Sequence, residues 1–296
     1  MRLGAFVVTV FALLSLSGAQ EVRRPPITGF SHVAFYSSSP VAAKQFYAGL
    51  LGLEPGERPG LYIVGRQSIE AEAEKPAQPP SLLSHIAFAT PDAEGMRRYL
   101  QSCGVQVPAN TNRESNGTRW FGLKDPEGHA IEFVQESVRK RTKGRAVSSQ
   151  IIHAGFVVRD RTVEDKFYRD ILGFKLYWSG GMEDGHTDWV AMQVPEGRQW
   201  IEYMMTEKDA QPSPQLLGVL NHVSLGVSDI KAAARLLRSR GWNPREEAEP
   251  QMGKDGKWQL NVYDPDGTRV ELMEFRPVKN PCCSPFTGPH PEQSAP

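Results

Sequence analysis

The chain has 296 residues, of which 40% are hydrophobic and 23% charged, and its 34 basic residues balance its 34 acidic ones. This neutrality gives no electrostatic reason to expect nucleic acid or an anionic membrane as a partner. The length is sufficient for two domains of ordinary size, each with its own core.

The N-terminal segment has the pattern of a secretory signal peptide. Arg2 supplies the positive charge, residues 3–16 are almost entirely apolar or small, and small residues end at Ala19. The apolar run is shorter than the roughly 20 residues of a transmembrane helix. We therefore predict a signal peptide over residues 1–19, export to the periplasm or the medium, and no membrane anchor after cleavage.

A short strand pattern built around one histidine occurs four times along the chain. Apolar or small residues flank each histidine, and four of the seven histidines occupy this position. Such recurrence indicates an internal repeat of strands. The four segments are Ser31-His32-Val33-Ala34-Phe35, Ser84-His85-Ile86-Ala87-Phe88, Ile152-His153-Ala154-Gly155-Phe156 and Asn221-His222-Val223-Ser224-Leu225.

An amphipathic helix is predicted after each of these strands, with a glycine just past its last apolar turn as the stop signal. These glycines are Gly52, Gly104, Gly173 and Gly241. The first and third copies also share an aromatic pair, Phe46-Tyr47 and Phe167-Tyr168, which we expect to anchor the core. Odd copies therefore resemble odd copies and even copies resemble even ones, as in a duplicated pair of modules.

Each copy ends in a β-prone run that carries one glutamate among apolar neighbours. The four glutamates are Glu70, Glu132, Glu202 and Glu271. Turn signals precede the last three, as in Asp125-Pro126-Glu127-Gly128, Val194-Pro195-Glu196-Gly197 and Asp264-Pro265-Asp266-Gly267. Proline at the second position and glycine at the fourth suit a type I turn between two strands. Each glutamate is therefore expected on one face of the last strand of its copy.

The fold predicted from this order is α+β, with four βαβββ modules arranged as two paired-module domains. The domains span residues 28–138 and 149–276, and a basic linker, residues 139–148, separates them. We interpret this basic stretch as a solvated linker rather than a nucleic-acid site. A Pro-rich tail covers residues 277–296.

Three cysteines give little information about the fold. Cys282 and Cys283 are adjacent, and adjacent cysteines rarely bond each other without strain. A bond from the tail to Cys103 is the alternative, and it would leave one thiol unpaired.

The recurring histidine and glutamate suggest a metal site. They lie close together if the first and last strands of a module are neighbours, and two facing modules then offer up to two imidazoles and two carboxylates. Mixed nitrogen and oxygen ligation suits Zn²⁺, Ni²⁺, Mn²⁺ or Fe²⁺. The alternative for any single pair is a buried core histidine and a solvent-facing glutamate, and the fourfold recurrence favours metal.

Together, the histidine strands, the Phe-Tyr helix ends and the Asp-Pro-x-Gly turns before a glutamate resemble the vicinal oxygen chelate superfamily. That superfamily includes glyoxalase I, epimerases, extradiol dioxygenases and bleomycin-type resistance proteins. The resemblance covers residues 28–276 and implies curved sheets around a divalent metal that binds two vicinal oxygens of a small-molecule substrate. The metal ligands it implies are His32, Glu70, His85 and Glu132 in the first domain and His153, Glu202, His222 and Glu271 in the second.

The two sets differ in spacing. His32 and Glu70 are closer in sequence than the other three pairs, so Glu70, Glu72 and Glu74 all stay open as the fourth ligand. If one set is degenerate, we expect it to be the N-terminal one.

The resemblance implies three functions, of which we favour the first. A glyoxalase- or epimerase-like lyase or isomerase would use the metal to stabilise an enediolate, with Glu202 or Glu271 as ligand and base. An extradiol ring-cleaving dioxygenase would use His153, His222 and Glu271, together with a tyrosine where this chain has Asn261; Tyr263 follows two residues later.

The third function is small-molecule binding without catalysis. Tryptophans of the second half would line the pocket in that case, and otherwise belong to the core. They are Trp178, Trp189, Trp200, Trp242 and Trp258. Such binding could occur with or without metal, and a protein that binds no divalent ion would leave this function alone.

Overall fold

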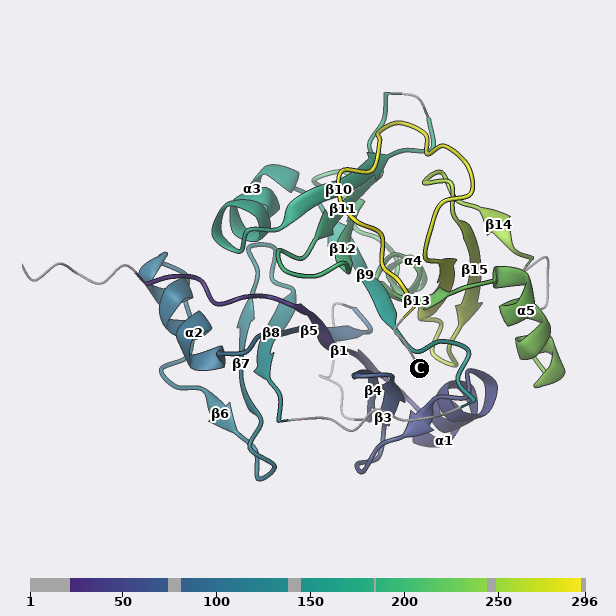
Figure 1. Ribbon diagram of the computed structural model, residues 1–296, viewed down its shortest axis with the longest axis horizontal. Coiled ribbons are helices and arrows are strands. Elements are labelled where there is room, and N and C mark those ends of the chain that lie inside the picture. The colour runs from purple at the N-terminus through teal and green to yellow at the C-terminus, as the bar shows by residue number, and fades with distance from the viewer. Residues whose placement is uncertain (1–21, 74–80, 138–144, 184, 244–248, 294–296) are drawn as a thin grey trace, which may run out of the picture.

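The computed structural model describes residues 22–73, 81–137, 145–183, 185–243 and 249–293. Its strands form two eight-stranded sheets, one from each half of the chain (Figure 1). The predicted signal peptide, Glu74 and residues 139–144 of the predicted linker lie outside the described residues.

The first sheet has the strand order β2-β3-β4-β1-β5-β8-β7-β6. Its strands are β1 (Gly29–Tyr36), β2 (Glu54–Pro55), β3 (Leu61–Val64), β4 (Gln67–Glu72), β5 (Leu83–Ala89), β6 (Asn112–Arg113), β7 (Arg119–Lys124) and β8 (Ala130–Gln135). Helix α1 (Pro40–Lys44) follows β1 and continues as the π-helix η1 (Gln45–Leu50). Helix α2 (Ala93–Ser102) follows β5.

The second sheet repeats this order as β10-β11-β12-β9-β13-β16-β15-β14. Its strands are β9 (Ile151–Val158), β10 (Lys175–Gly180), β11 (Trp189–Gln193), β12 (Trp200–Met205), β13 (His222–Val227), β14 (Gln251–Met252), β15 (Trp258–Tyr263) and β16 (Arg269–Glu274). Helix α3 (Arg161–Asp165) with its π-helix η2 (Lys166–Ile171) and helix α5 (Ile230–Ser239) complete the modules. A short helix that the sequence patterns did not indicate, α4 (Pro214–Leu220), precedes β13.

The α+β class and the four βαβββ modules in two pairs are confirmed. In every module the last strand returns to lie parallel to the first, as β4 does to β1 and β8 to β5. The first strands of paired modules, β1 with β5 and β9 with β13, run antiparallel at the centre of each sheet. The first and last strands are therefore neighbours, as the metal hypothesis requires.

The central strands bury one face in a main core that joins both halves of the chain. On β12, Ile201 and Tyr203 belong to this core, whereas Trp200 and Glu202 alternate with them and point to the opposite face. We call that opposite face, in either sheet, the histidine face. The rings of Phe88 and Phe174, from different halves, lie 5.4 Å apart in the main core.

The aromatic pairs of the odd modules are buried in the main core, as predicted. Their helices end differently from a regular α-helix, because Leu51 N–H donates to the Phe46 carbonyl and Leu172 N–H to that of Phe167. A glycine follows each widened turn. In the first module this glycine, Gly52, has a φ of 70°, in the left-handed region that favours glycine.

The C-terminal tail packs on the second sheet over residues 277–293. Trp178 Nε1 donates to the Cys282 carbonyl at 3.2 Å, and Thr287 N–H donates to the Tyr177 carbonyl at 3.0 Å. Gln193 Nε2 donates to the carbonyl of Pro289 at 2.8 Å. Figure 1 shows this yellow segment crossing in front of β10, β11 and β12.

The expectation that the adjacent cysteines do not pair is wrong, because Cys282 and Cys283 form a disulfide. Cys283 takes a φ of 73°, which turns the chain at this point. Cys103 is a free, exposed residue at the end of α2 in the first half of the chain, and the tail lies on the second half.

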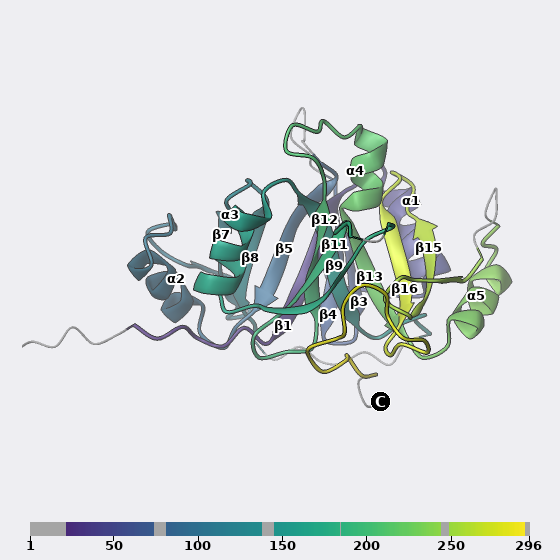
Figure 2. The ribbon, with the colours of Figure 1, turned by 90° about the horizontal axis from the view of Figure 1, so that it is seen from above.

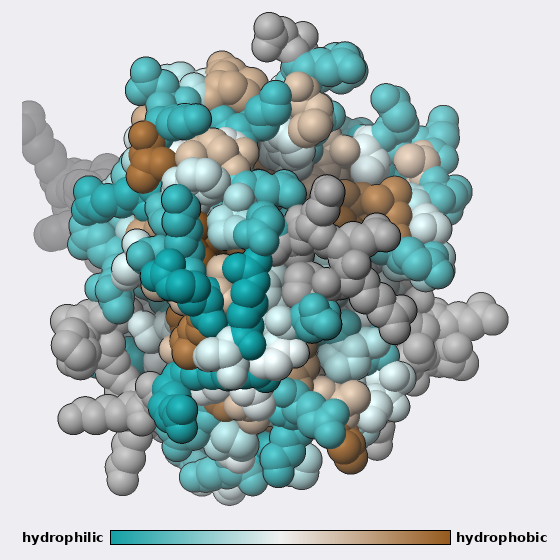
Figure 3. Space-filling view, turned by 90° about the vertical axis from the view of Figure 1, so that its right-hand side faces the viewer, coloured by the Kyte–Doolittle hydropathy of each residue, from teal (hydrophilic) through white to brown (hydrophobic). Residues whose placement is uncertain are grey.

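Helices α2 and α5 lie at opposite ends of the molecule, with the two sheets between them (Figure 2). Among the described residues, no helix is long and apolar enough to span a bilayer. On the face seen in Figure 3, hydrophilic side chains surround small, separate hydrophobic ones.

Candidate metal centres

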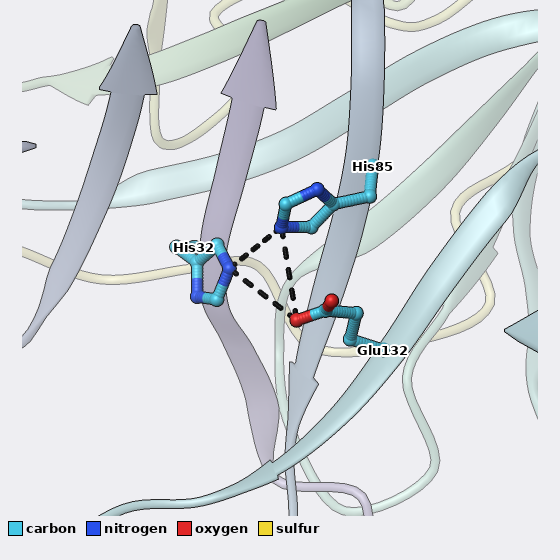
Figure 4. A group of neighbouring side chains, drawn as sticks. All are labelled: His32, His85 and Glu132. Carbon is cyan, nitrogen blue, oxygen red and sulfur yellow. Dashed lines mark hydrogen bonds and ion pairs between the residues drawn. The ribbon is translucent and has the colours of Figure 1, made fainter. Parts of the chain in front are cut away.

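The four predicted N-terminal ligands meet on the histidine face of the first sheet. His32 and His85 point their Nε2 atoms at each other, 2.9 Å apart, from the neighbouring strands β1 and β5 (Figure 4). The Oε2 atom of Glu132 on β8 lies 3.7 Å from both nitrogens. On the other side of β1, the Oε1 atom of Glu70 lies 3.9 Å from His32 Nε2.

Serine hydroxyls support the far side of both imidazoles. Ser84 Oγ lies 3.2 Å from His85 Nδ1 and donates to Glu72 Oε2 at 2.7 Å. In the same way, Ser31 Oγ lies 3.1 Å from His32 Nδ1 and donates to Glu136 Oε1. A serine that donates to a carboxylate can only accept from the histidine, so these contacts favour a proton on each Nδ1 and a lone pair on each Nε2.

The fourth ligand position of this set belongs to Glu70. Arg58, from the loop before β3, forms an ion pair with Glu70 Oε1 and holds the carboxylate beside His32. Glu72 instead supports Ser84, and its Oε1 lies 3.8 Å from Nδ1 of His85, on the side away from the other ligands. The geometry therefore selects Glu70 over Glu72.

The four predicted C-terminal ligands also meet, on the histidine face of the second sheet. His153 Nε2 lies 3.0 Å from His222 Nε2, 3.2 Å from Glu271 Oε2 and 3.9 Å from Glu202 Oε2. The same Glu202 oxygen lies 3.5 Å from His222 Nε2. The duplication thus reproduces the arrangement of the N-terminal set.

In the part of the chain that the structure describes, the Nδ1 atoms of the C-terminal histidines do not contact serine hydroxyls. Nδ1 of His222 lies 2.8 Å from the Leu220 carbonyl and 2.9 Å from an Arg269 guanidinium nitrogen. It can donate to the first or accept from the second, and accepting places the proton on Nε2, where it blocks a metal. Nδ1 of His153 is buried without a hydrogen-bond partner among the described residues.

Burial and charge shift several pKa values at these centres. Burial raises the pKa of Glu132 and that of Glu202. Burial would also raise the pKa of Glu271, but the hydrogen bond and charge of His153 and the charge of Arg269 lower it to about 2. Burial, then the charges of Arg269 and His153, place the pKa of His222 well below its ordinary value.

The two sets differ most in access. The side chains of His32, His85 and Glu132 keep 10%, 12% and 18% of their exposure, whereas those of His153 and His222 keep 0%. Solvent therefore reaches the histidines of the N-terminal set but not those of the C-terminal set, whose Glu202 keeps 14% of its exposure.

Aromatic side chains and the tail close the C-terminal histidine face. Trp200 packs on the ring of His153 at 4.7 Å, Tyr177 on Trp200 at 5.0 Å, and Phe286 of the tail on Tyr177 at 4.8 Å. The fully buried ammonium group of Lys257 lies 4.4 Å from the centre of the Trp200 ring. Of the five tryptophans considered as pocket lining, Trp178, Trp189 and Trp200 belong to this closed face, and Trp242 and Trp258 pack against the main core.

Both sets have the composition of a divalent metal site. Each brings two imidazole nitrogens and a carboxylate oxygen to within 4.8 Å of one another, a mixed donor set that Zn²⁺ and its neighbours accept. In the N-terminal set the serine contacts favour lone pairs on both Nε2 atoms, directed at the shared carboxylate. In the C-terminal set no such contact among the described residues fixes the tautomers. The N-terminal residues fit a metal ion best.

The sequence interpretation did not identify the supporting residues, namely Ser31, Ser84, Arg58 and Lys257. A signal for the serines is present in the sequence, because serine precedes the histidine in the first two copies, and isoleucine and asparagine do so in the last two. The loop position of Arg58 and the burial of Lys257 carry no comparable signal.

Family comparison supports this architecture. The model of the Glyoxalase/Bleomycin resistance protein/Dioxygenase superfamily matches residues 29–133 and again residues 150–272. The chain belongs to this superfamily. Its matched segments coincide with the two pairs of modules, so the resemblance to the vicinal oxygen chelate superfamily is confirmed.

Relatives of this superfamily member include lyases. The lactoylglutathione lyase of Haemophilus influenzae is 28% identical over 131 residues, which cover 44% of this chain and 96% of that protein. A probable chloroplastic lactoylglutathione lyase of Arabidopsis thaliana is 23% identical over 231 residues, covering 74% of this chain and 59% of that protein.

Solved structures with the same fold include extradiol dioxygenases. Homoprotocatechuate 2,3-dioxygenase from Brevibacterium fuscum gives a TM-score of 0.64 at 18% identity, covering 85% of this chain and 72% of that one. The enzyme from Arthrobacter globiformis gives 0.64 at 16% identity, covering 86% and 82%. At this identity the likeness concerns the fold alone.

Proposed function

We propose that this protein is an exported, metal-dependent lyase or isomerase of the glyoxalase type, acting on a small molecule with vicinal oxygens. We place its working metal centre at His32, Glu70, His85 and Glu132. The single observation that carries this assignment is the contact of the Ser31 and Ser84 hydroxyls with the Nδ1 atoms of His32 and His85, which turns both Nε2 atoms toward Glu132.

Metal-binding histidines need a hydrogen-bond partner on the ring nitrogen that faces away from the metal. The carboxylates of Glu72 and Glu136 hold the serine hydroxyls, and the hydroxyls hold the imidazole N–H groups. Such partners fix the tautomer and the ring orientation and make the ligating nitrogen more basic. The metal remains one of Zn²⁺, Ni²⁺, Mn²⁺ or Fe²⁺, since the donor set suits all four.

The chemistry follows from the positions of the carboxylates. A bound divalent ion would polarise the substrate oxygens and make the adjoining C–H acidic. Glu132, the most exposed of the N-terminal ligands and 3.7 Å from both Nε2 atoms, takes that proton and returns it to the neighbouring carbon. Arg58 keeps Glu70 in place beside His32 during this transfer.

The C-terminal set, to which the sequence interpretation gave the catalytic glutamates, stands as a second proposed centre. Glu202 and Glu271 have the same geometry as their N-terminal counterparts, but the aromatic cluster and the tail cover their histidines. Lys257 also supplies a buried positive charge beside these carboxylates. Because His153 and His222 are fully covered whereas His32 and His85 are not, we assign the role of base to Glu132.

Two observations bear on the alternative functions. Tyr263, the candidate dioxygenase tyrosine, is 49% exposed at the end of β15, opposite Arg269, while Asn261 is the residue opposite Glu271. This placement argues against ring cleavage at the C-terminal set. A protein that only binds a small molecule, without catalysis, would not need the contacts of Ser31 and Ser84 that orient His32 and His85.

Export is proposed from the pattern of residues 1–19, and a disulfide between Cys282 and Cys283 suits an oxidising compartment. Mass spectrometry of protein recovered from the expressing cells would check it. Cleavage after Ala19 is expected, and an intact Met1 in the exported fraction would contradict the proposal.

The experiment that tests the function compares His32→Ala and His85→Ala with the matched variant His222→Ala. Metal content per chain is measured on protein purified without chelators, together with lyase activity on glutathione adducts of 2-oxoaldehydes and oxygen uptake with catechols. We expect the two N-terminal variants to lose one metal ion and the lyase activity, and His222→Ala to keep the activity.

Other outcomes contradict the proposal in distinct ways. Activity lost only in His222→Ala would transfer the centre to the second sheet. Oxygen uptake without lyase activity would make the protein a dioxygenase. Metal content that no variant changes would leave a binding protein.

A further inference from the structure

A third cluster of histidine and carboxylates lies where the two domains meet, away from both histidine faces. Asp125 and His129 belong to the turn between β7 and β8 of the first domain, and Glu164 to helix α3 of the second. His129 Nδ1 lies 2.8 Å from Asp125 Oδ2. One ligand atom from each of the three residues lies within 4.8 Å of the others.

Glu164 is the residue of this cluster whose buried carboxylate is only partly hydrogen-bonded. It is 0% exposed, and its Oε1 accepts a hydrogen bond from Glu127 N–H at 2.9 Å. Its Oε2 is buried and has no hydrogen-bond partner among the described residues. A buried carboxylate oxygen without a partner is strongly destabilising, so this atom calls for a proton or a cation.

The arginines around the cluster form ion pairs with acidic residues outside it. Arg159 lies 3.6 Å from Glu127, and Arg161 and Arg169 lie 3.3 and 3.5 Å from Asp165. Of the described ion pairs, the one that reaches this cluster is the contact of His129 with Asp125. His129 is thus ion-paired with Asp125, and none of the described ion pairs includes Glu164.

The pseudo-twofold arrangement of the protein supplies an internal comparison. Tyr168 donates to Asp125 Oδ2 at 3.1 Å. At the position related to it by the pseudo-twofold rotation, called the mirror position below, Tyr47 donates to Asp264 Oδ2 at 3.0 Å. Each aspartate also accepts a backbone N–H four residues later, from His129 and from Thr268, at 2.8 Å.

At the mirror position the additional ligands are missing. Thr268 stands where the first contact has His129, and Ala43, three residues before Phe46, stands where Glu164 precedes Phe167. The tyrosine–aspartate contact between domains therefore forms without a histidine or a glutamate. His129 and Glu164 must serve something else.

We propose that Asp125, His129 and Glu164 bind a divalent cation of the Zn²⁺ class, which joins the two domains. One imidazole and two carboxylates form a donor set that Zn²⁺ accepts, and its charge balances both carboxylates. Because the ligands come from different domains, binding stabilises their association and the folded chain. The site is independent of the proposed catalytic centre.

The test uses Zn²⁺ as the probe and the full chain as the protein. Elemental analysis compares wild type with Glu164→Gln and His129→Thr, the latter copying the mirror residue. Each variant is expected to bind one Zn²⁺ fewer per chain than wild type, and to lose the Zn²⁺-dependent part of the increase in melting temperature. Asp264→Asn, which alters the mirror contact, is the matched control and should keep the full Zn²⁺ content.

Several results would overturn the proposal. Equal Zn²⁺ content in wild type, Glu164→Gln and His129→Thr is one, and equal loss in Asp264→Asn is another. If the variants do not fold, anomalous scattering from Zn²⁺-soaked crystals of the wild-type protein decides, because a peak among the three side chains is expected and its absence refutes the site. Loss of the ion at His32 and His85 is read separately from His32→Ala.

Discussion

A guanidinium nitrogen of Arg269 lies 2.9 Å from Nδ1 of His222, where the equivalent histidine of the second module, His85, has the hydroxyl of Ser84. Arginine can only donate, so this contact favours the histidine tautomer with its proton on Nε2. The serine favours the opposite tautomer. This difference between two otherwise matching centres leads to the first two predictions.

Replacing Arg269 by methionine should improve metal binding at the C-terminal set. Without the guanidinium, His222 donates from Nδ1 to the Leu220 carbonyl and frees Nε2. We expect about tenfold tighter Zn²⁺ binding, an effect of the size that residues hydrogen-bonded to a metal ligand have on metal affinity. Titration calorimetry in a His32→Ala/His85→Ala background measures it, and unchanged affinity would refute the tautomer argument.

Replacing Ser84 by alanine should weaken metal binding at the N-terminal set. The variant removes the link between His85 and Glu72, and a loss of roughly 10–100-fold in metal affinity is expected. Competition with a chelator measures the affinity. Ser102→Ala, at an exposed hydroxyl that donates to the Tyr99 carbonyl, is the control and should change nothing.

The burial of Asp264 should make stability depend on pH. Burial raises the pKa of Asp264 from 3.8 to about 6, so the folded state binds more protons than the unfolded state between these values. The contribution of Asp264 to the free energy of unfolding therefore falls as pH rises from about 4 to 6, by roughly 3 kcal/mol at most. Denaturant unfolding of wild type and Asp264→Asn across this range should show that fall in wild type alone, and parallel profiles would contradict it.

Removing the ring of Phe286 should loosen the tail. The ring packs on Tyr177 at 4.8 Å and lies 5.0 Å from the Lys257 ammonium group. Because Phe286 is only partly buried, a loss of about 1–2 kcal/mol is expected, below the range for a core phenylalanine. Thermal unfolding and proteolysis of the tail measure it against Pro285→Ala, an exposed neighbour. A tail equally resistant in both variants would show that Phe286 does not hold it.

The sequence alone determined the modules and the positions of the recurring histidines and glutamates. Histidine before an apolar run and glutamate after an Asp-Pro-x-Gly turn are local patterns, and a βαβββ module places its first and last strands side by side. His85 with Glu132, and His222 with Glu271, could therefore be placed side by side before any contact was known. The buried Phe46-Tyr47 and Phe167-Tyr168 pairs followed from the same local patterns.

Tertiary structure alone decided which centre is open and how its histidines are oriented. The tail that covers Trp200, the Arg58 beside Glu70 and the Glu164 that meets His129 all join segments far apart in the chain. Such contacts depend on how the domains and the tail pack, and no periodicity or turn signal encodes them. Burial and proton position, which set the chemistry of a histidine, are properties of that packing.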